Sequence, residues 1–160
     1  MTRRARKYVL DTQLFIKAFR DPAANEALQR FHRAFSSFEH LSVVVAQELR
    51  AGVKRPNDRK ALERRVFRAF ERASRTITPS ADAWHRSGDL LAAMAKQEGL
   101  ESARVSKAFA NDVLLAVSCR ESGCVLVTEN DREFSRIQRF ISFEFVKPWP
   151  GDGLGLVEHH

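Results

Sequence analysis

Residues 111–134 read NDVLLAVSCRESGCVLVTENDREF, and this stretch decides the fold. It opens with Asp112 inside an apolar segment of helical spacing, stops near Gly123 and continues as the apolar run Cys124–Val127. Acidic residues follow that run directly. Short apolar strands that alternate with helices are typical of a parallel sheet covered by helices on both faces. The stretch therefore predicts one helix-strand unit of such a sheet, with acids at both of its ends.

Two upstream segments place acids in the same way. Residues 8–10 are apolar and run straight into Asp11, and the apolar run 41–46 leads to Glu48 on a predicted helix. Ionised carboxylates rarely occupy apolar surroundings unless they are paired or bind a metal. Convergence of Asp11, Glu48 and Asp112 on one divalent cation would account for all three acids together.

The rest of the chain alternates strands and helices. Strands are predicted at 7–10, 38–42, 75–77, 124–127 and 143–146, and helices at 12–20, 23–35, 43–53, 80–99, 106–121 and 131–138. A turn at 56–58 is expected to cap a further long helix that runs through residue 73. We expect one three-layer α/β/α domain over residues 1–149, with a central, mostly parallel sheet of about four to five strands. Residues 150–160 are interpreted as a Gly-rich tail that can include tag residues, so His159 and His160 are left out of any site.

The predicted sheet also indicates where a ligand would bind. In open parallel sheets, ligands lie at the carboxyl ends of the strands, near the point where the strand order switches. Asp11 ends the first strand, and residues 128–133 follow a later one. We therefore expect both in one crevice. Oxygen ligands without soft ones favour magnesium or manganese over zinc.

The charge favours a polyanionic partner. The net charge is +7 and the pI is about 10.0, and cations that neutralise phosphates supply affinity independent of sequence. Solubility alone is the simpler interpretation. Basic residues gather at 3–7 and at 54–75, where the spacing predicts an amphipathic helix with a basic face.

Other features bear on the compartment. Cys119 and Cys124 form no CxxC motif and no zinc-type cluster with histidine, so reduced thiols are expected. The sequence holds neither a signal-peptide pattern nor an apolar run of membrane length. We therefore expect a soluble, cytoplasmic protein without membrane association.

Five segments resemble the successive motifs of PIN-domain ribonucleases, in particular the VapC-type toxins of bacterial toxin-antitoxin pairs. They are YVLDTQLFI (8–16), VVVAQELRAG (43–52), TPSADAWHRSGDLLAAM (78–94), NDVLLAVSCRESGCVLVT (111–128) and TENDREFSRI (128–137). The resemblance runs from about residue 7 to about residue 149. Each motif alone is weak, whereas five in the right order are fairly specific. The resemblance implies a PIN-like fold.

The resemblance also assigns residues. Asp11, Glu48 and Asp112 take the places of the first three family acids. After the strand the family usually has Thr-x-Asn-x-x-Asp-Phe or Thr-x-Asp; Thr128 and Asn130 match, but Glu133 stands where that Asp would be. Asp131 is an additional acid, and Gln13 replaces the Asn common after Asp-Thr. The expected catalytic residues are thus Asp11, Glu48, Asp112 and Glu133, with Asp11 and Asp112 as metal ligands and Asp131, Asn130, Thr128 and Thr12 in supporting positions.

The chemistry that the resemblance implies is metal-assisted hydrolysis of RNA phosphodiesters. One or two Mg²⁺ ions, for which Mn²⁺ can substitute, would activate water and stabilise developing charge. The implied substrate is RNA, with tRNA and rRNA as candidates. The implied partners are a small cognate antitoxin and a second copy of the chain in a homodimer.

Each feature also has a simpler interpretation. Asp11 is suited to an N-cap, Glu48 to a solvated pair with Arg50 or Arg55, and Asp131 to a second N-cap. Glu133 is suited to the first turn of a helix. Three or four coincidences are then needed, so the metal site is preferred. His32, His40 and His85 match no ligand spacing and are expected on the partly exposed surface, whereas Trp84 and the many Phe residues are expected in the core.

Two other functions stay open. A non-catalytic PIN-like module would use the basic face to bind RNA without needing the acids. An aspartate-based phosphotransfer domain would use Asp11 as a nucleophile, although Gln13 stands where a haloacid-dehalogenase-like fold wants a second Asp.

Overall fold

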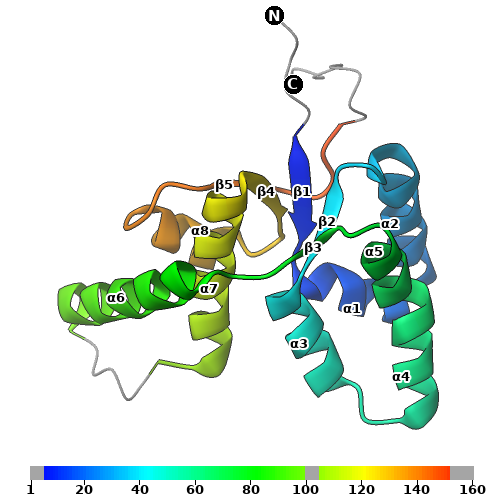
Figure 1. The fold of residues 1–160 in the computed structure, drawn as a ribbon, viewed down its shortest axis with the longest axis horizontal. Helices are drawn as coiled ribbons and strands as arrows, with labels where there is room; N and C mark the ends of the chain where they lie inside the picture. Colours follow the sequence, from blue (N-terminus) through cyan, green and yellow to red (C-terminus); the bar gives the residue numbers. More distant parts are fainter. Residues whose placement is uncertain (1–5, 100–104, 152–160) are drawn as a thin grey trace, which may run out of the picture.

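A computed structural model of the protein describes residues 6–99 and 105–151. Its five strands form one sheet in the order β3-β2-β1-β4-β5, and every neighbouring pair is parallel. In Figure 1, α1, α2, α4 and α5 lie to the right of β1, α3 lies below it, and α6, α7 and α8 lie to its left. The expected sheet between helical layers is confirmed. The tail beyond Gly151 and the first five residues lie outside the described residues.

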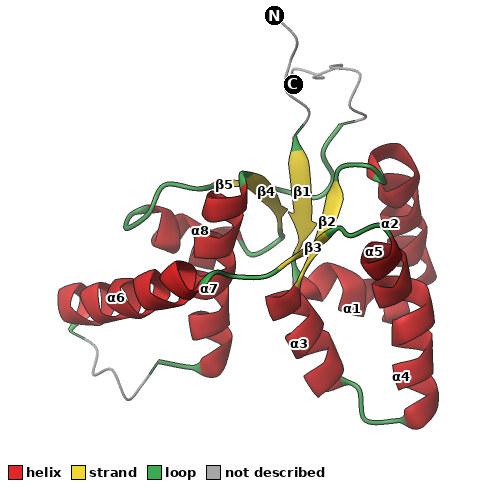
Figure 2. Cartoon of the chain, in the orientation of Figure 1, coloured by secondary structure: helices red, strands yellow, loops and turns green. Residues whose placement is uncertain are grey.

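The element bounds agree closely with the sequence pattern. The strands are β1 (Lys7–Leu10), β2 (Glu39–Ser42), β3 (Thr76–Ile77), β4 (Cys124–Val127) and β5 (Glu144–Val146). The helices are α1 (Thr12–Arg20), α2 (Pro22–Phe35), α3 (Val43–Gly52), α4 (Pro56–Leu62), the π-helical turn η1 (Glu63–Phe67), α5 (Arg68–Arg72), α6 (Ala81–Glu98), α7 (Lys107–Ser122) and α8 (Asp131–Gln138). Figure 2 shows the strands as a central group between helices.

Local sequence signals set these bounds. Side chains of Ser80 and Ser106 accept hydrogen bonds from the first turns of α6 and α7, which satisfies backbone donors that would otherwise lack partners. Gly99 and Gly123 end the same helices with φ of +67°, a conformation that costs glycine little.

The core lies on both faces of the two central strands. Val9 and Leu10 of β1 and Leu126 and Val127 of β4 are almost fully buried, as expected for strands covered on both sides. Tyr8 packs against Phe31 and Phe35 of α2 on one face. An aromatic cluster of Phe134, Phe143 and Phe145 packs around α8 and β5. The carboxyl ends of β1 and β4 are therefore held by a rigid framework.

Two expectations about single elements are wrong. The residues of the turn expected at 56–58 already belong to α4, and the long helix expected to run through residue 73 is interrupted by the π-helical turn η1. Trp84, expected in the core, is 59% exposed. The buried face of α6 is formed by Ala83, Ser87 and Met94, and Trp84 lies one residue away from Ala83, about 100° around the helix. Phe19 and Phe38 are also exposed.

Three further expectations have outcomes here. Cys119 and Cys124 are buried free thiols. His32 is half-buried and pairs with the buried carboxylate of Glu39, a partnership that the sequence pattern does not reveal. Within the described ranges, no helix combines the length and apolarity that crossing a membrane requires.

Candidate active site

The strand order reverses between β1 and β4. From β1 the chain builds β2 and β3 on one side and then returns to place β4 on the other side. Leu10 and Val127, the last residues of these two strands, are paired. Crevices at such reversal points are the usual ligand sites of parallel sheets. Asp11 and Thr128 directly follow these paired strand ends, where such a crevice is expected.

Asp11 is held from two sides. Its Oδ1 accepts a hydrogen bond from the Thr12 backbone N–H (2.8 Å), and its Oδ2 accepts one from the Thr128 hydroxyl (2.7 Å). The residue is only 7% exposed. Burial raises the pKa of Asp11, and the bonds from Thr128 and Thr12 lower it in part. Asp11 therefore does cap α1, as its simpler interpretation suggested, and it also fixes a carboxylate at the crevice.

Glu48 reaches the same place from α3. Its Oε1 accepts a hydrogen bond from the Thr12 hydroxyl (2.8 Å), so Thr12 bridges Asp11 and Glu48. Burial raises the pKa of Glu48, and the charge of Asp11 raises it further, against lowering contributions from Thr12, Asn111 and Lys107. Arg50 pairs with Glu63 instead, and among the described residues neither Arg50 nor Arg55 forms the ion pair with Glu48 that the simpler interpretation offered.

Asp112 completes the group from α7. Burial raises the pKa of Asp112 to about 7, and the negative charges of Asp11, Glu48 and Glu133 contribute in that order. The charges of the other three acids expected from the sequence thus all act on Asp112. These four acids, contributed by four separate segments, are here called the acid crevice.

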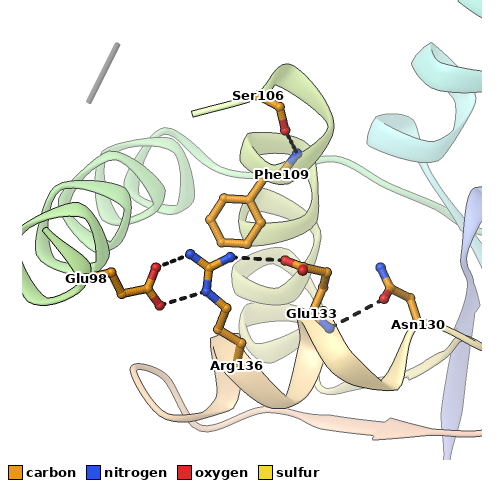
Figure 3. A network of polar contacts seen from close by, with 6 residues as sticks. All are labelled: Glu98, Ser106, Phe109, Asn130, Glu133 and Arg136. Carbon is orange, nitrogen blue, oxygen red and sulfur yellow. Dashed lines mark hydrogen bonds and ion pairs between the residues drawn. The ribbon is translucent and has the colours of Figure 1, made fainter. Parts of the chain in front are cut away.

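Glu133 differs from the other three because a cation balances it. Arg136, one turn further along α8, donates a hydrogen bond from Nη1 to Glu133 Oε2 (3.3 Å). The same guanidinium makes a two-pronged contact with Glu98 at the end of α6, one bond of which measures 2.7 Å. Figure 3 shows Arg136 between the two carboxylates, with the Phe109 ring 4.5 Å from its Cζ. This contact joins α6, α7 and α8 beside the crevice.

The supporting residues take different positions. Asn130, not Asp131, caps α8, and its side chain accepts from the Glu133 backbone N–H (3.4 Å). The Thr128 hydroxyl accepts from the Asn130 backbone N–H (3.0 Å) while it donates to Asp11. Asp131 is exposed. The N-cap interpretation of Asp131 is therefore wrong.

The donor set suits a hard divalent cation. The crevice offers carboxylate and hydroxyl oxygens, the ligands that Mg²⁺ and Mn²⁺ prefer, and a cation would relieve the repulsion that raises the pKa of Asp112. Across residues 6–99 and 105–151, no three His, Cys, Asp or Glu side chains stand close enough together to hold one ion. The residues thus fit such an ion in chemistry and charge, although their side chains are not arranged as a closed set of ligands in the described ranges.

Sequence reasoning missed the residues around the acids. Glu133 and Arg136 are three residues apart, which is the spacing of a helical ion pair, so this partner had a detectable signal. Glu98 had none, because it meets Arg136 only through the packing of α6 beside α8. Asn111 and Lys107 lie on the helix that carries Asp112 and act on Glu48, a relation that only the approach of α7 to α3 creates.

Comparisons with solved structures agree with this architecture. A DNA-bound VapBC complex from Salmonella typhimurium contains a chain with 21% identity and a TM-score of 0.65, covering 89% of this chain and 98% of that one. FitAcB from Neisseria gonorrhoeae matches with 19% identity, a TM-score of 0.62 and the same coverage. VapBC2 from Rickettsia felis, bound to a promoter DNA fragment, matches with 23% identity and a TM-score of 0.57, again with the same coverage. At these identities the likeness establishes the fold.

The family of the protein follows from its sequence. No curated protein matches the chain. The model of the PIN domain family matches residues 8–139, a span that runs from β1 past the end of α8 and includes Asp11, Glu48, Asp112 and Glu133. Because that match covers most of the chain and the fold agrees with it, the protein belongs to the PIN domain family.

Proposed function

We propose that the protein is a Mg²⁺-dependent endoribonuclease that acts in the cytoplasm as the toxin of a toxin-antitoxin pair. The observation that carries the proposal is the joining of Asp11 and Glu48 through Thr12 at the end of β1, with the charges of both acids acting on Asp112 of α7. PIN domains are generally nucleases, and such a cluster is what a nuclease needs to hold a divalent cation.

The residues divide the chemistry among them. A bound Mg²⁺, or Mn²⁺ in its place, supplies an activated water and stabilises charge on the phosphate oxygens. Asp11 and Asp112 hold the ion, and Glu48 supports it from α3. Thr12 and Thr128 keep the carboxylates of Glu48 and Asp11 in orientation through their hydroxyls.

Glu133 and the surrounding groups complete the site. Arg136 holds Glu133 at the edge of the crevice, where its carboxylate can orient water or a second ion. Asn130 fixes the start of α8 and so the position of Glu133. The charge of Lys107 acts on Glu48, and we expect this side chain to contact a phosphate beside the scissile bond. Asp131 is exposed, and we expect the smallest contribution from it.

The comparisons support the biological setting. The similar solved structures are VapBC and FitAB assemblies, which include an antitoxin component, and some of them are bound to DNA. We therefore propose a small cognate antitoxin as a partner of this chain and, as the sequence resemblance implies, a homodimer. Size-exclusion chromatography with light scattering tests the homodimer, and a monomer at micromolar concentration would contradict it.

The decisive experiment is cleavage of a pool of tRNA and rRNA by the purified protein. Wild type with Mg²⁺ or Mn²⁺ should release discrete fragments, and EDTA should stop it. Asp11→Asn and Asp112→Asn should each lower the rate by about a hundredfold or more, since losing a ligand costs more than losing one of its supporting bonds. Asp131→Asn is the matched control, because it removes an exposed acid from the same end of the sheet.

Two results would count against the proposal. Cleavage by Asp112→Asn at the rate of wild type would show that the acid crevice is not needed for the reaction. No cleavage by wild type, together with RNA binding that survives both EDTA and Asp112→Asn, would favour a non-catalytic RNA-binding module instead.

A further inference from the structure

The excess positive charge of the chain lies almost entirely in one segment. Residues 54–75 contain nine Lys or Arg and three Asp or Glu, so they carry +6 of the net charge of +7. The other 138 residues together are close to neutral. A charge spread for solubility would be distributed over the surface, whereas this one is concentrated on one segment, which consists of α4, η1, α5 and the residues that flank them. We call this segment the basic limb.

The limb presents its cations on the side away from the core. Leu62, Val66, Phe67 and Phe70 are buried and anchor it. Arg64, Arg68 and Arg72 are exposed and follow one another at four-residue intervals, which places them along one side of the helix. Lys54, Arg55 and Lys60 are exposed at its beginning. The limb is thus an amphipathic rod with a row of arginines on its outer side.

Most of these cations lack acidic partners. Arg65 stacks over Phe19 at 4.5 Å and donates to Asn25, and Arg59 donates to the Val53 carbonyl. The one ion pair that a limb residue makes, among the residues that the structure describes, joins Glu63 to Arg50. No carboxylate of the described ranges lies within ion-pair distance of Arg64, Arg68 or Arg72. These three guanidiniums are available to an anionic partner.

The limb is fastened to the helix that carries Glu48. Arg50, two residues beyond Glu48 on α3, pairs with Glu63 and also places its Cζ 4.2 Å from the centre of the Phe67 ring. In Figure 1, α3 lies between α7, which carries Asp112, and α4 at the outer edge. The limb is therefore joined directly to the helix that supplies one of the four acids.

We propose that the outer face of the basic limb binds the phosphate backbone of the RNA substrate, outside the acid crevice. This inference rests on the proposed ribonuclease function. Guanidinium groups form paired hydrogen bonds with phosphate oxygens, and each phosphate that they neutralise releases condensed counterions. A row of arginines without carboxylate partners suits a linear polyanion better than a folded protein surface, where charges of both signs alternate. The limb thus extends substrate binding beyond the few nucleotides that the crevice can hold.

The test compares two triple variants of equal charge loss. The limb variant is Arg64→Gln, Arg68→Gln, Arg72→Gln, and the control is Arg33→Gln, Arg86→Gln, Lys96→Gln, whose residues are exposed on α2 and α6. The full-length proteins are titrated, in EDTA, into a fluorescein-labelled single-stranded RNA 20-mer at several KCl concentrations. Circular dichroism and thermal melting confirm that both variants are folded.

Expected results are quantitative. Each lost phosphate contact should lower the slope of log Kd against log salt by about 0.7, so the limb variant should lose about 2 units of slope and bind about tenfold or more weakly near 0.1 M KCl. The control variant should stay within about twofold of wild type. Equal loss in both variants, or no loss in the limb variant, would overturn the inference. Tighter binding of wild type to a labelled 20-residue polyglutamate than to the RNA would assign the face to an acidic protein instead.

A second measurement separates this inference from the proposed activity. With Mg²⁺, the limb variant should cleave a tetranucleotide too short to span both surfaces with the kcat/KM of wild type, and it should cleave the 20-mer with a raised KM. Loss of cleavage on both substrates would overturn the inference, because the limb would then support the crevice itself. If wild type cleaves neither substrate but binds the 20-mer through the limb, the ribonuclease proposal fails and the binding surface stands.

Discussion

The acid crevice and the basic limb each gather charges of one sign, but in different surroundings. In the crevice, Asp11, Glu48, Asp112 and Glu133 meet where burial restricts water, and the result is a carboxyl group whose pKa is raised to about 7. On the limb, Arg64, Arg68 and Arg72 stand in solvent. Charges interact strongly where the dielectric is low and weakly where water and salt screen them. The crevice should therefore affect the stability of the folded chain, whereas the limb should affect only what the chain binds.

The largest change in the free energy of unfolding is expected from Asp112→Asn in metal-free protein. Because the pKa of Asp112 is raised from 3.8 to about 7, the folded state holds a proton that the unfolded state releases. The free energy of unfolding should therefore fall as the pH rises from about 4 to about 7 and stay level above that. Asparagine carries no charge and so avoids the cost of ionising residue 112 in the folded state. The free energy of unfolding of the variant should therefore exceed that of wild type by about 2 kcal/mol at pH 8, less than the full pKa shift implies because the site is partly solvated.

Urea unfolding in EDTA at pH 4.5 and pH 8 measures this difference. The advantage of the variant should be much smaller at the lower pH. Added Mg²⁺ should stabilise wild type at pH 8 and leave Asp112→Asn nearly unchanged, since a ligand stabilises only the state that binds it. Asp131→Asn, which removes an exposed acid, should show neither behaviour. An advantage of equal size at both pH values would show that repulsion within the crevice is not its cause.

The crevice also shows what a sequence can and cannot predict. The acids were detectable because each interrupts an apolar pattern or ends a strand, and the topology that unites them follows from short strands alternating with helices. Helix ends were predictable from Asp, Ser and Gly signals that act within one turn. Whether these acids catalyse anything stays a prediction.

Several features of the structure depend on long-range packing, which the sequence pattern could not reveal. Glu98 meets Arg136 only because α6 and α8 approach one another beside Phe109. The exposure of Trp84 depends on which side of α6 faces α7, and small residues such as Ala83 and Ser87 form that side. The π-helical turn η1 arises in a segment rich in ordinary helix formers, so residue propensity gave no sign of it.

A loss of unfolding free energy of intermediate size is expected from Arg136→Ala. The variant leaves Glu98 and Glu133 without their shared cation in half-buried positions and removes the contact with Phe109. Charge-assisted hydrogen bonds of this kind contribute about 1–3 kcal/mol, and partial exposure places the expected loss in unfolding free energy at about 1–2 kcal/mol. Urea unfolding at pH 8 measures the loss.

Two further variants test whether the guanidinium itself is needed. Arg132→Ala on the same helix removes an exposed arginine and should change the free energy of unfolding by less than about 0.5 kcal/mol. Arg136→Lys keeps the charge but not the planar pair of donors, so it should fall between alanine and wild type. If Arg136→Ala is as stable as Arg132→Ala, the contact between α6 and α8 contributes nothing and Glu133 belongs with the unbalanced acids of the crevice.

The smallest effect is expected from the limb variant that replaces Arg64, Arg68 and Arg72 by glutamine. These side chains are exposed, and glutamine forms helices about as well as arginine, so the free energy of unfolding should change by less than about 0.5 kcal/mol. Urea unfolding at low and high salt measures it. A gain in stability that disappears at high salt would show that the arginines repel one another measurably in the folded chain, and the contrast with the crevice would then be one of degree. If the free energy of unfolding is unchanged while RNA binding weakens, the limb arginines act in binding rather than in folding. The loss of affinity then cannot come from a damaged fold.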